Sequence, residues 1–260
     1  MIDQGSGPPV VLIPGLQGRW EWMRPTVDAL ARQNRVLSFS LCDEPSSSFR
    51  CDTARGFENY VEQVAAVLDR ARVDSATVVG VSFGGLIAAE FAARFPDRAS
   101  ALILASALHY GWQPDARARM YLMSPRLLSP LFVATAPGRL NREISAALPD
   151  LRDRMRFVAG HGLRVARAPM SPSKMARRVE WAARHQFADL RQLQVPALVV
   201  TGEPGLDRVV PVEHTRRYLS ELPGARHQVL SRTGHLGIVT RPDAFAEMLG
   251  KFVDGNRIPA

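Results

Sequence analysis

The 260-residue chain contains two cysteines, only two lysines and no long uninterrupted run of apolar residues. Cys42 and Cys51 are too few for a disulfide framework, so we expect a reduced, cytoplasmic compartment. Apolar runs such as Val10 to Ile13 fall far short of the roughly 20 residues that cross a bilayer, which excludes a membrane-spanning protein. The first residues lack the basic and apolar segments of a secretory signal. No metal-ligand spacing and no nucleotide-binding fingerprint is present, so we expect neither metal nor cofactor.

Basic residues outnumber acidic ones, and nearly all of them are arginine. The segment 109–190 holds 14 basic and 6 acidic residues, which accounts for the whole formal net charge of +8. This local excess suits an acidic partner or a carboxylate substrate, although solvated helix faces are the simpler explanation. No aromatic-interleaved basic strand accompanies the charge, so no nucleic-acid partner is expected.

The two ends of the chain alternate short apolar runs with amphipathic stretches. Strands are predicted at 9–13, 36–41, 77–81, 101–105, 197–201 and 227–230, and helices of ordinary length separate most of them. Strands alternating with helices indicate an α/β fold whose mainly parallel sheet of about six strands is covered on both faces. Because only eight residues precede Pro9, no further strand is expected before it, and the six are expected to be all parallel.

The segment 109–190 interrupts this alternation. It is rich in proline and predicts several helices without a convincing strand. We therefore expect a core made of residues 1–108 and 191–260, with a helical lid at 109–190 inserted between two strands of the sheet.

The sharpest motif is Gly80-Val81-Ser82-Phe83-Gly84. It follows a predicted strand and opens a predicted helix of small residues, the setting in which a tight turn exposes a serine at the carboxyl edge of a sheet. Glycines are required there because a Cβ would collide with neighbouring elements. The pattern predicts that Ser82 is a nucleophile.

A serine nucleophile needs a base, and the base needs an orienting acid. His235 lies in a loop between the last predicted strand and the last helix, at the same sheet edge as Ser82, and His109 is the less favoured substitute. Asp207, in the loop after the strand 197–201, is the predicted acid, with Glu203 as the alternative. The order Ser, Asp, His is the one expected for this turn.

These three loops together resemble the α/β-hydrolase fold superfamily, in its small-esterase branch with a helical lid. The resemblance implies that Ser82 is the nucleophile, Asp207 the orienting acid and His235 the general base. It also implies an oxyanion hole made by the N–H of Phe83 and a second N–H from the loop 14–18, where Leu16 is preferred and Gln17 stays open. The family usually has histidine before the glycine of that loop, and here Pro14 replaces it, so the loop must be supported differently.

The resemblance implies hydrolysis of a small carboxylic ester or thioester through an acyl-enzyme. C–C bond hydrolysis or a pyruvate-eliminating lyase reaction on the same triad is the alternative, and a non-catalytic binding or signalling protein is a further one. An acidic carrier protein is the special partner that an arginine-rich lid suggests. Apolar residues expected to line the pocket are Trp22, Leu108, Tyr121 and Leu236, together with Trp20, Phe83 and Leu122.

Overall fold

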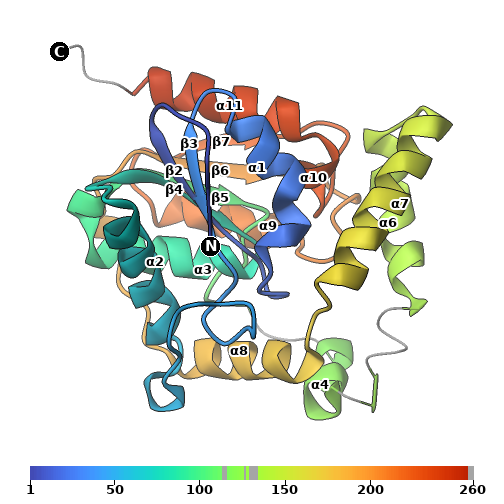
Figure 1. Cartoon of the computed structure of the whole chain (residues 1–260), viewed down its shortest axis with the longest axis horizontal. Coiled ribbons are helices and arrows are strands. Elements are labelled where there is room, and N and C mark those ends of the chain that lie inside the picture. The colour runs from blue at the N-terminus through green and yellow to red at the C-terminus, as the bar shows by residue number, and fades with distance from the viewer. Residues whose placement is uncertain (113–115, 126, 129–133, 257–260) are drawn as a thin grey trace.

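The computed structural model describes residues 1–112, 116–125, 127–128 and 134–256. A seven-stranded sheet in the order β1-β3-β2-β4-β5-β6-β7 forms the centre of the molecule (Figure 1). Its strands are β1 (Ile2–Gln4), β2 (Pro9–Ile13), β3 (Arg35–Ser38), β4 (Ala76–Val81), β5 (Ala99–Ala105), β6 (Ala197–Thr201) and β7 (Arg226–Val229).

Six strands are parallel, as the sequence predicts, but the sheet has one more. β1 pairs antiparallel with β3, with Asp3 opposite Leu37. The expectation that no strand precedes Pro9 and that all strands are parallel is therefore wrong. Three residues suffice for an edge strand, and Arg35 of β3 binds the carboxylate of Asp3 at 2.7 Å, so the short strand has a side-chain anchor as well as its ladder.

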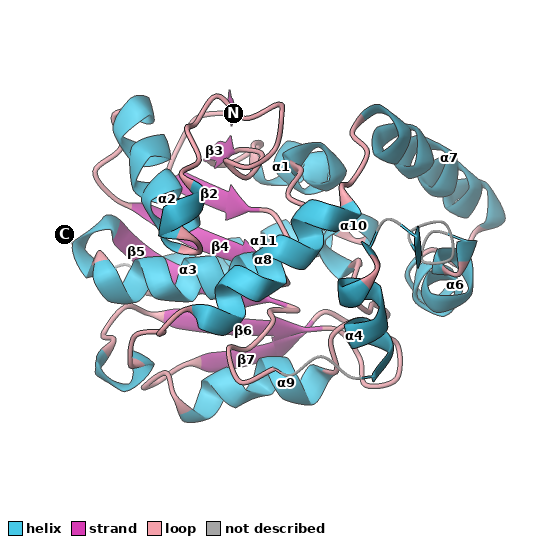
Figure 2. Cartoon of the chain, turned by 90° about the horizontal axis from the view of Figure 1, so that it is seen from below, coloured by secondary structure: helices cyan, strands magenta, loops and turns pink. Residues whose placement is uncertain are grey.

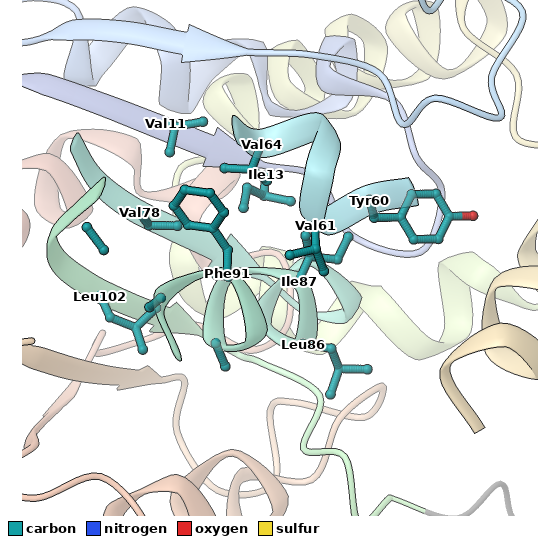
Figure 3. Packing of buried hydrophobic residues seen from close by; sticks show 14 of the residues in the cluster. Val11, Ile13, Tyr60, Val61, Val64, Val78, Leu86, Ile87, Phe91 and Leu102 are labelled. Carbon is teal, nitrogen blue, oxygen red and sulfur yellow. The ribbon is translucent and has the colours of Figure 1, made fainter. Parts of the chain in front are cut away.

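Alternate side chains of the central strands enter two separate cores. Val11 and Ile13 of β2 face one side, and Val10 and Leu12 face the other. Figure 3 shows the first core, where residues such as Val64 and Phe91 fill the space between the sheet and its covering helices. Burial on both faces explains why these strands read as continuous apolar runs.

Helices cover each face. The first core is roofed by α2 (Glu58–Ala71) and α3 (Phe83–Arg94), and the second by α1 (Arg24–Leu30), α10 (Gly237–Thr240) and α11 (Pro242–Asp254). Shorter elements complete this part: η1 (Trp20–Met23), η2 (Thr53–Arg55), η3 (Pro96–Arg98), η4 (Leu190–Gln192), α9 (Val212–Arg216) and η5 (Arg217–Ser220).

Between β5 and β6 lie α4 (Ala116–Met123), α6 (Ala136–Ala147), α7 (Leu151–Arg167) and α8 (Pro172–Arg184), together termed the cap. α6 and α7 stand to one side of the sheet, while α8 runs along the body of the molecule (Figures 1 and 2). Residues 113–115, 126 and 129–133 of the predicted insertion lie outside the described residues. No helix in the described part of the chain is both long and apolar enough to cross a membrane.

Candidate active site

Ser82 is the single residue between β4 and α3. Its backbone has φ 53° and ψ −121°, a conformation that non-glycine residues rarely adopt. Hydrogen bonds hold the turn from both sides: the Ser82 N–H donates to the Ala105 carbonyl at 3.1 Å, and the Ser82 carbonyl accepts from the Leu108 N–H at 2.9 Å. The strained turn therefore fixes Ser82 at the carboxyl edge of the sheet.

The glycines on either side of Ser82 have no room for a side chain. A Cβ on Gly84 would lie 2.5 Å from the carbonyl oxygen of Pro14 and 2.6 Å from that of Ile13. A Cβ on Gly80 would lie 2.6 Å from the Cβ of Ala88. Both glycines therefore allow β2, β4 and α3 to approach closely around the serine.

Gly84→Ala is expected to destabilise the protein by about 1–3 kcal/mol, because backbone atoms must move to admit the methyl group. Gly162→Ala is the matched control, since a Cβ there meets nothing within 4 Å and Gly162 lies inside α7. In Gly162→Ala the free energy of unfolding is expected to stay the same or to rise by up to about 1 kcal/mol. Urea unfolding measures both, and equal stability of the two variants would contradict the packing argument.

His235 pairs with Asp207 in the structure. The imidazole Nδ1 lies 3.3 Å from Oδ2 of Asp207, whose other oxygen accepts the N–H groups of Val209 at 3.0 Å and Val210 at 2.8 Å. A carboxylate can only accept, so Nδ1 carries the hydrogen and Nε2 keeps a lone pair for a proton. The pair therefore has the arrangement of an oriented general base.

The electrostatics of the pair favour ionised forms. Burial alone would raise the pKa of Asp207, but the charge and hydrogen bond of His235 together with two backbone N–H groups hold that pKa below its usual range. Burial likewise opposes a charged His235, yet the charge and hydrogen bond of Asp207 raise the pKa of the imidazole above its ordinary value. An imidazolium at His235 is thus stabilised.

The two alternatives from the sequence have other partners. The His109 ring is bound to Glu221 at 3.1 Å and accepts the N–H of Gly111 at 3.0 Å, which accounts for both ring nitrogens. The carboxylate of Glu203 accepts the N–H of Arg232 at 2.6 Å. These contacts give His109 and Glu203 structural roles and leave His235 and Asp207 as the preferred candidates.

The loop after β2 lies against the serine. A Cβ on Gly15 would be 3.3 Å from the Cβ of Ser82, and the Gly18 N–H closes the loop by donating to the Gly15 carbonyl at 2.9 Å. Phe83 is the first residue of α3, so its N–H has no acceptor within the helix. Leu16 stays our choice for the second N–H of an oxyanion hole, with Gln17 as the alternative.

A cap arginine supports this loop where the sequence lacks the usual histidine. Arg178 of α8 is fully buried, and its guanidinium donates to the Leu16 carbonyl at 2.7 Å. The same group binds Asp43 at 2.7 Å and Glu44 at 2.5 Å. The cap therefore ties the loop to two buried carboxylates through one side chain.

Sequence reasoning did not find Arg178, nor Glu143 of α6, whose buried carboxylate accepts the Leu236 N–H at 3.1 Å. Both side chains lie on cap helices and belong to no motif. The proline in place of histidine at Pro14 was the one signal that some other group must support the loop.

The predicted pocket residues have different surroundings. Leu108 and Leu236 are beside the site, since their backbone N–H groups bind Ser82 and Glu143. Trp22 donates its indole N–H to the Ala168 carbonyl at 2.9 Å and so joins the core to the cap, while Tyr121 lies on α4, which packs on α8. These four, with Trp20 and Leu122, stay predictions as pocket residues. The prediction for the Phe83 side chain is wrong: it is 1% exposed, because it packs into the first core.

A serine on a strained strand-to-helix turn, with acid and histidine loops at the same edge of a mainly parallel sheet, defines the class of α/β hydrolases. The chain belongs to the alpha/beta hydrolase family, whose model matches residues 10–248. The predicted fold is thereby confirmed.

Two curated relatives resemble the chain over nearly its whole length. One is a 2-hydroxy-6-oxo-2,4-heptadienoate hydrolase of Pseudomonas putida, 27% identical, covering 96% of this chain and 91% of its own. The other is a poly(3-hydroxyalkanoate) depolymerase of Ectopseudomonas oleovorans, 26% identical, covering 96% and 85%. Among solved structures, the enol-lactonase of Burkholderia xenovorans has a TM-score of 0.77 at 22% identity, covering 97% of this chain and 95% of its own. That likeness shows the shared fold.

Proposed function

We propose that the protein is a serine hydrolase that cleaves a small carboxylic ester or thioester through an acyl-enzyme on Ser82. The observation that carries the proposal is Ser82 itself, held at φ 53° beside the Gly15–Leu16 loop. The pairing of His235 with Asp207 supports it, because the pair supplies the base that a serine nucleophile needs.

In the proposed mechanism, Ser82 Oγ attacks the substrate carbonyl while Nε2 of His235 takes its proton. The tetrahedral oxyanion is stabilised by the N–H groups of Leu16 and Phe83, an effect of a few kcal/mol on the barrier (about 3 for one donor). The imidazolium then returns the proton to the leaving group. Water, activated by His235, attacks the acyl-enzyme and frees Ser82.

The test is pre-steady-state hydrolysis of p-nitrophenyl esters of graded acyl length. We expect a burst of one p-nitrophenolate per enzyme molecule, followed by slower turnover, and a mass increase of the protein equal to the acyl group. Turnover without a burst or an acyl adduct on any ester of the series, even at low temperature, would contradict an accumulating acyl-enzyme. The dependence on acyl length measures how long a chain the pocket accepts.

A second candidate, cleavage of a C–C bond, is favoured by the name of one relative. A 2-hydroxy-6-oxo-2,4-heptadienoate contains ketone, enol and carboxylate groups but no ester bond, whereas a poly(3-hydroxyalkanoate) is a polyester. Two relatives that are about equally similar to this chain in sequence thus have names that imply different reactions, C–C bond cleavage for one and ester hydrolysis for the other. Turnover of such a dienoate, with no hydrolysis of any ester, would replace the ester proposal with this one. A pyruvate-eliminating lyase reaction and a non-catalytic role have no comparable support.

The substrate in this proposal is a small molecule, and the carrier-protein hypothesis gains nothing from the relatives named above. Several cap arginines already have partners inside the protein: Arg178 and Arg177 bind Asp43, and Arg154 donates to Ser145. Those groups are less available to an acidic partner than the composition suggests. The reduced compartment rests on the cysteine content alone, and both thiols are free.

A further inference from the structure

Glu143 is a buried carboxylate beside the candidate base. It lies on α6 of the cap, is 2% exposed, and faces the loop that carries His235. Its Oε2 accepts the Leu236 N–H at 3.1 Å and lies so close to Gly234 that a Cβ there would collide with it. Glu143 therefore hydrogen-bonds to the backbone immediately after His235 and packs against the residue immediately before it.

The loop is shaped to receive this carboxylate. A Cβ on Gly234 would collide with Oε2 of Glu143 as well as with the Leu206 carbonyl, so only glycine fits at that position. A buried carboxylate without a cation is costly unless hydrogen bonds and nearby positive charge offset its desolvation. Here the Leu236 N–H supplies a hydrogen bond, and His235 supplies the positive charge whenever its imidazole is protonated.

We propose that Glu143 is a positioning residue of the hydrolytic site: from the cap it fixes the backbone on both sides of His235 and places a second negative charge beside the imidazole. The inference rests on the role of His235 proposed above. Asp207 orients the ring through Nδ1, whereas Glu143 holds the chain that carries the ring. Cap docking and base positioning are thereby linked through one side chain.

The charges that act on Glu143 are those of His235 and Asp207. Burial is the main reason that the pKa of Glu143 is raised to about 7, even though the Leu236 N–H and the charge of His235 lower it. Glu143 in turn raises the pKa of His235, in addition to the larger effect of Asp207. Above neutral pH, Glu143 is therefore ionised and stabilises the imidazolium that forms when Ser82 loses its proton.

Glu143→Gln keeps an acceptor oxygen and removes the charge, whereas Glu143→Ala removes both. Without the charge, the imidazolium is less stable and the pKa of His235 falls. Because Glu143 itself titrates near pH 7, it is only partly ionised along this limb, and we expect Glu143→Gln to move the acid limb of the kcat/KM profile to lower pH by at most about one unit. We also expect kcat at its plateau to fall by up to about tenfold, with KM unchanged. Glu143→Ala is expected to lower kcat further, because the Leu236 N–H also loses its acceptor.

Glu90→Gln is the matched control. Glu90 is a comparably buried carboxylate that accepts a backbone N–H, from Ala188 at 2.9 Å, and faces an imidazole, that of His185 at 3.2 Å. Since that imidazole is not the candidate base, the pH profile of Glu90→Gln is expected to match the wild type. Thermal unfolding of all three variants separates a loss of stability from a change in the site.

The titration of His235 gives a readout that does not depend on activity. NMR of 13C-labelled histidine, with His235→Gln to assign the signal, follows the imidazole directly. A lower pKa in Glu143→Gln supports the inference even if no ester is hydrolysed, in which case the proposed function fails by itself. An unshifted His235 signal and an unshifted acid limb in Glu143→Gln would overturn the inference, whatever Ser82 does.

Discussion

Ser82→Ala is expected to remove the burst, the acyl adduct and nearly all turnover, lowering kcat by about 10⁴-fold or more. The reason is that the oriented pair of His235 and Asp207 has no hydroxyl from which to take a proton, although the N–H groups of Leu16 and Phe83 are unchanged. The structural cost is small, since the backbone hydrogen bonds of the turn do not involve the hydroxyl. Burst kinetics and intact-protein mass measure the loss.

Ser106→Ala is the control for this experiment. Ser106 also follows a strand, β5, has a positive φ of 41°, and uses its backbone N–H to bind the Val200 carbonyl at 2.8 Å. Unlike Ser82, Ser106 has no turn glycines around it and no helix directly after it, so it lacks the setting of a nucleophile. We therefore expect Ser106→Ala to leave the burst unchanged. If Ser82→Ala kept the wild-type burst, the acyl-enzyme on Ser82 would be disproved.

Arg178→Met is expected to be the most destabilising of the cap variants, by about 3–5 kcal/mol, because two buried carboxylates then lose their shared cation. The Leu16 carbonyl loses its donor at the same time. We also expect kcat to fall by about 10²-fold, since the N–H of Leu16 is no longer held in place for the oxyanion. Urea unfolding and single-turnover kinetics measure the two effects separately.

Arg177→Met provides the comparison on the same helix. Arg177 binds the same Asp43 at 3.3 Å, but its side chain is 37% exposed. An exposed ion pair contributes little, so the expected loss is about 1 kcal/mol or less, with kcat unchanged. Arg178→Lys keeps the positive charge, but an ammonium group cannot bind Leu16, Asp43 and Glu44 in the same geometry. This variant tests the same idea if Arg178→Met does not fold. Full kcat in both Arg178 variants would contradict the support of the loop.

Much of the fold was readable from the sequence because its signals are local. Apolar runs separated by amphipathic helices predicted the parallel strands, since each run must be buried on both faces of a covered sheet. β1 escaped prediction because Ile2–Gln4 is too short to show a pattern, and its place depends on pairing with the distant β3. The sequence also suggested that the Phe83 side chain lines the pocket. In the structure its ring packs against Phe57 and Tyr60 at the start of α2, a contact that no local pattern predicts.

The candidate triad was predicted for a topological reason. Ser82, Asp207 and His235 each follow a parallel strand, and the carboxyl ends of parallel strands meet at one edge of the sheet. The chain order alone therefore brought these loops together. The structure adds the contact between His235 and Asp207 and assigns His109 and Glu203 to other partners.

The sequence by itself determined the α/β-hydrolase fold, the strained serine turn and the loops in which the candidate acid and histidine lie, because the strand, turn and helix patterns that place them are local. Only the tertiary structure decided what supports them. Arg178 meets Leu16 across 162 positions, and Glu143 meets Leu236 across 93. Such contacts between a cap helix and a core loop carry no local signature, since they depend on how the cap docks and on which charges burial then forces to find a partner.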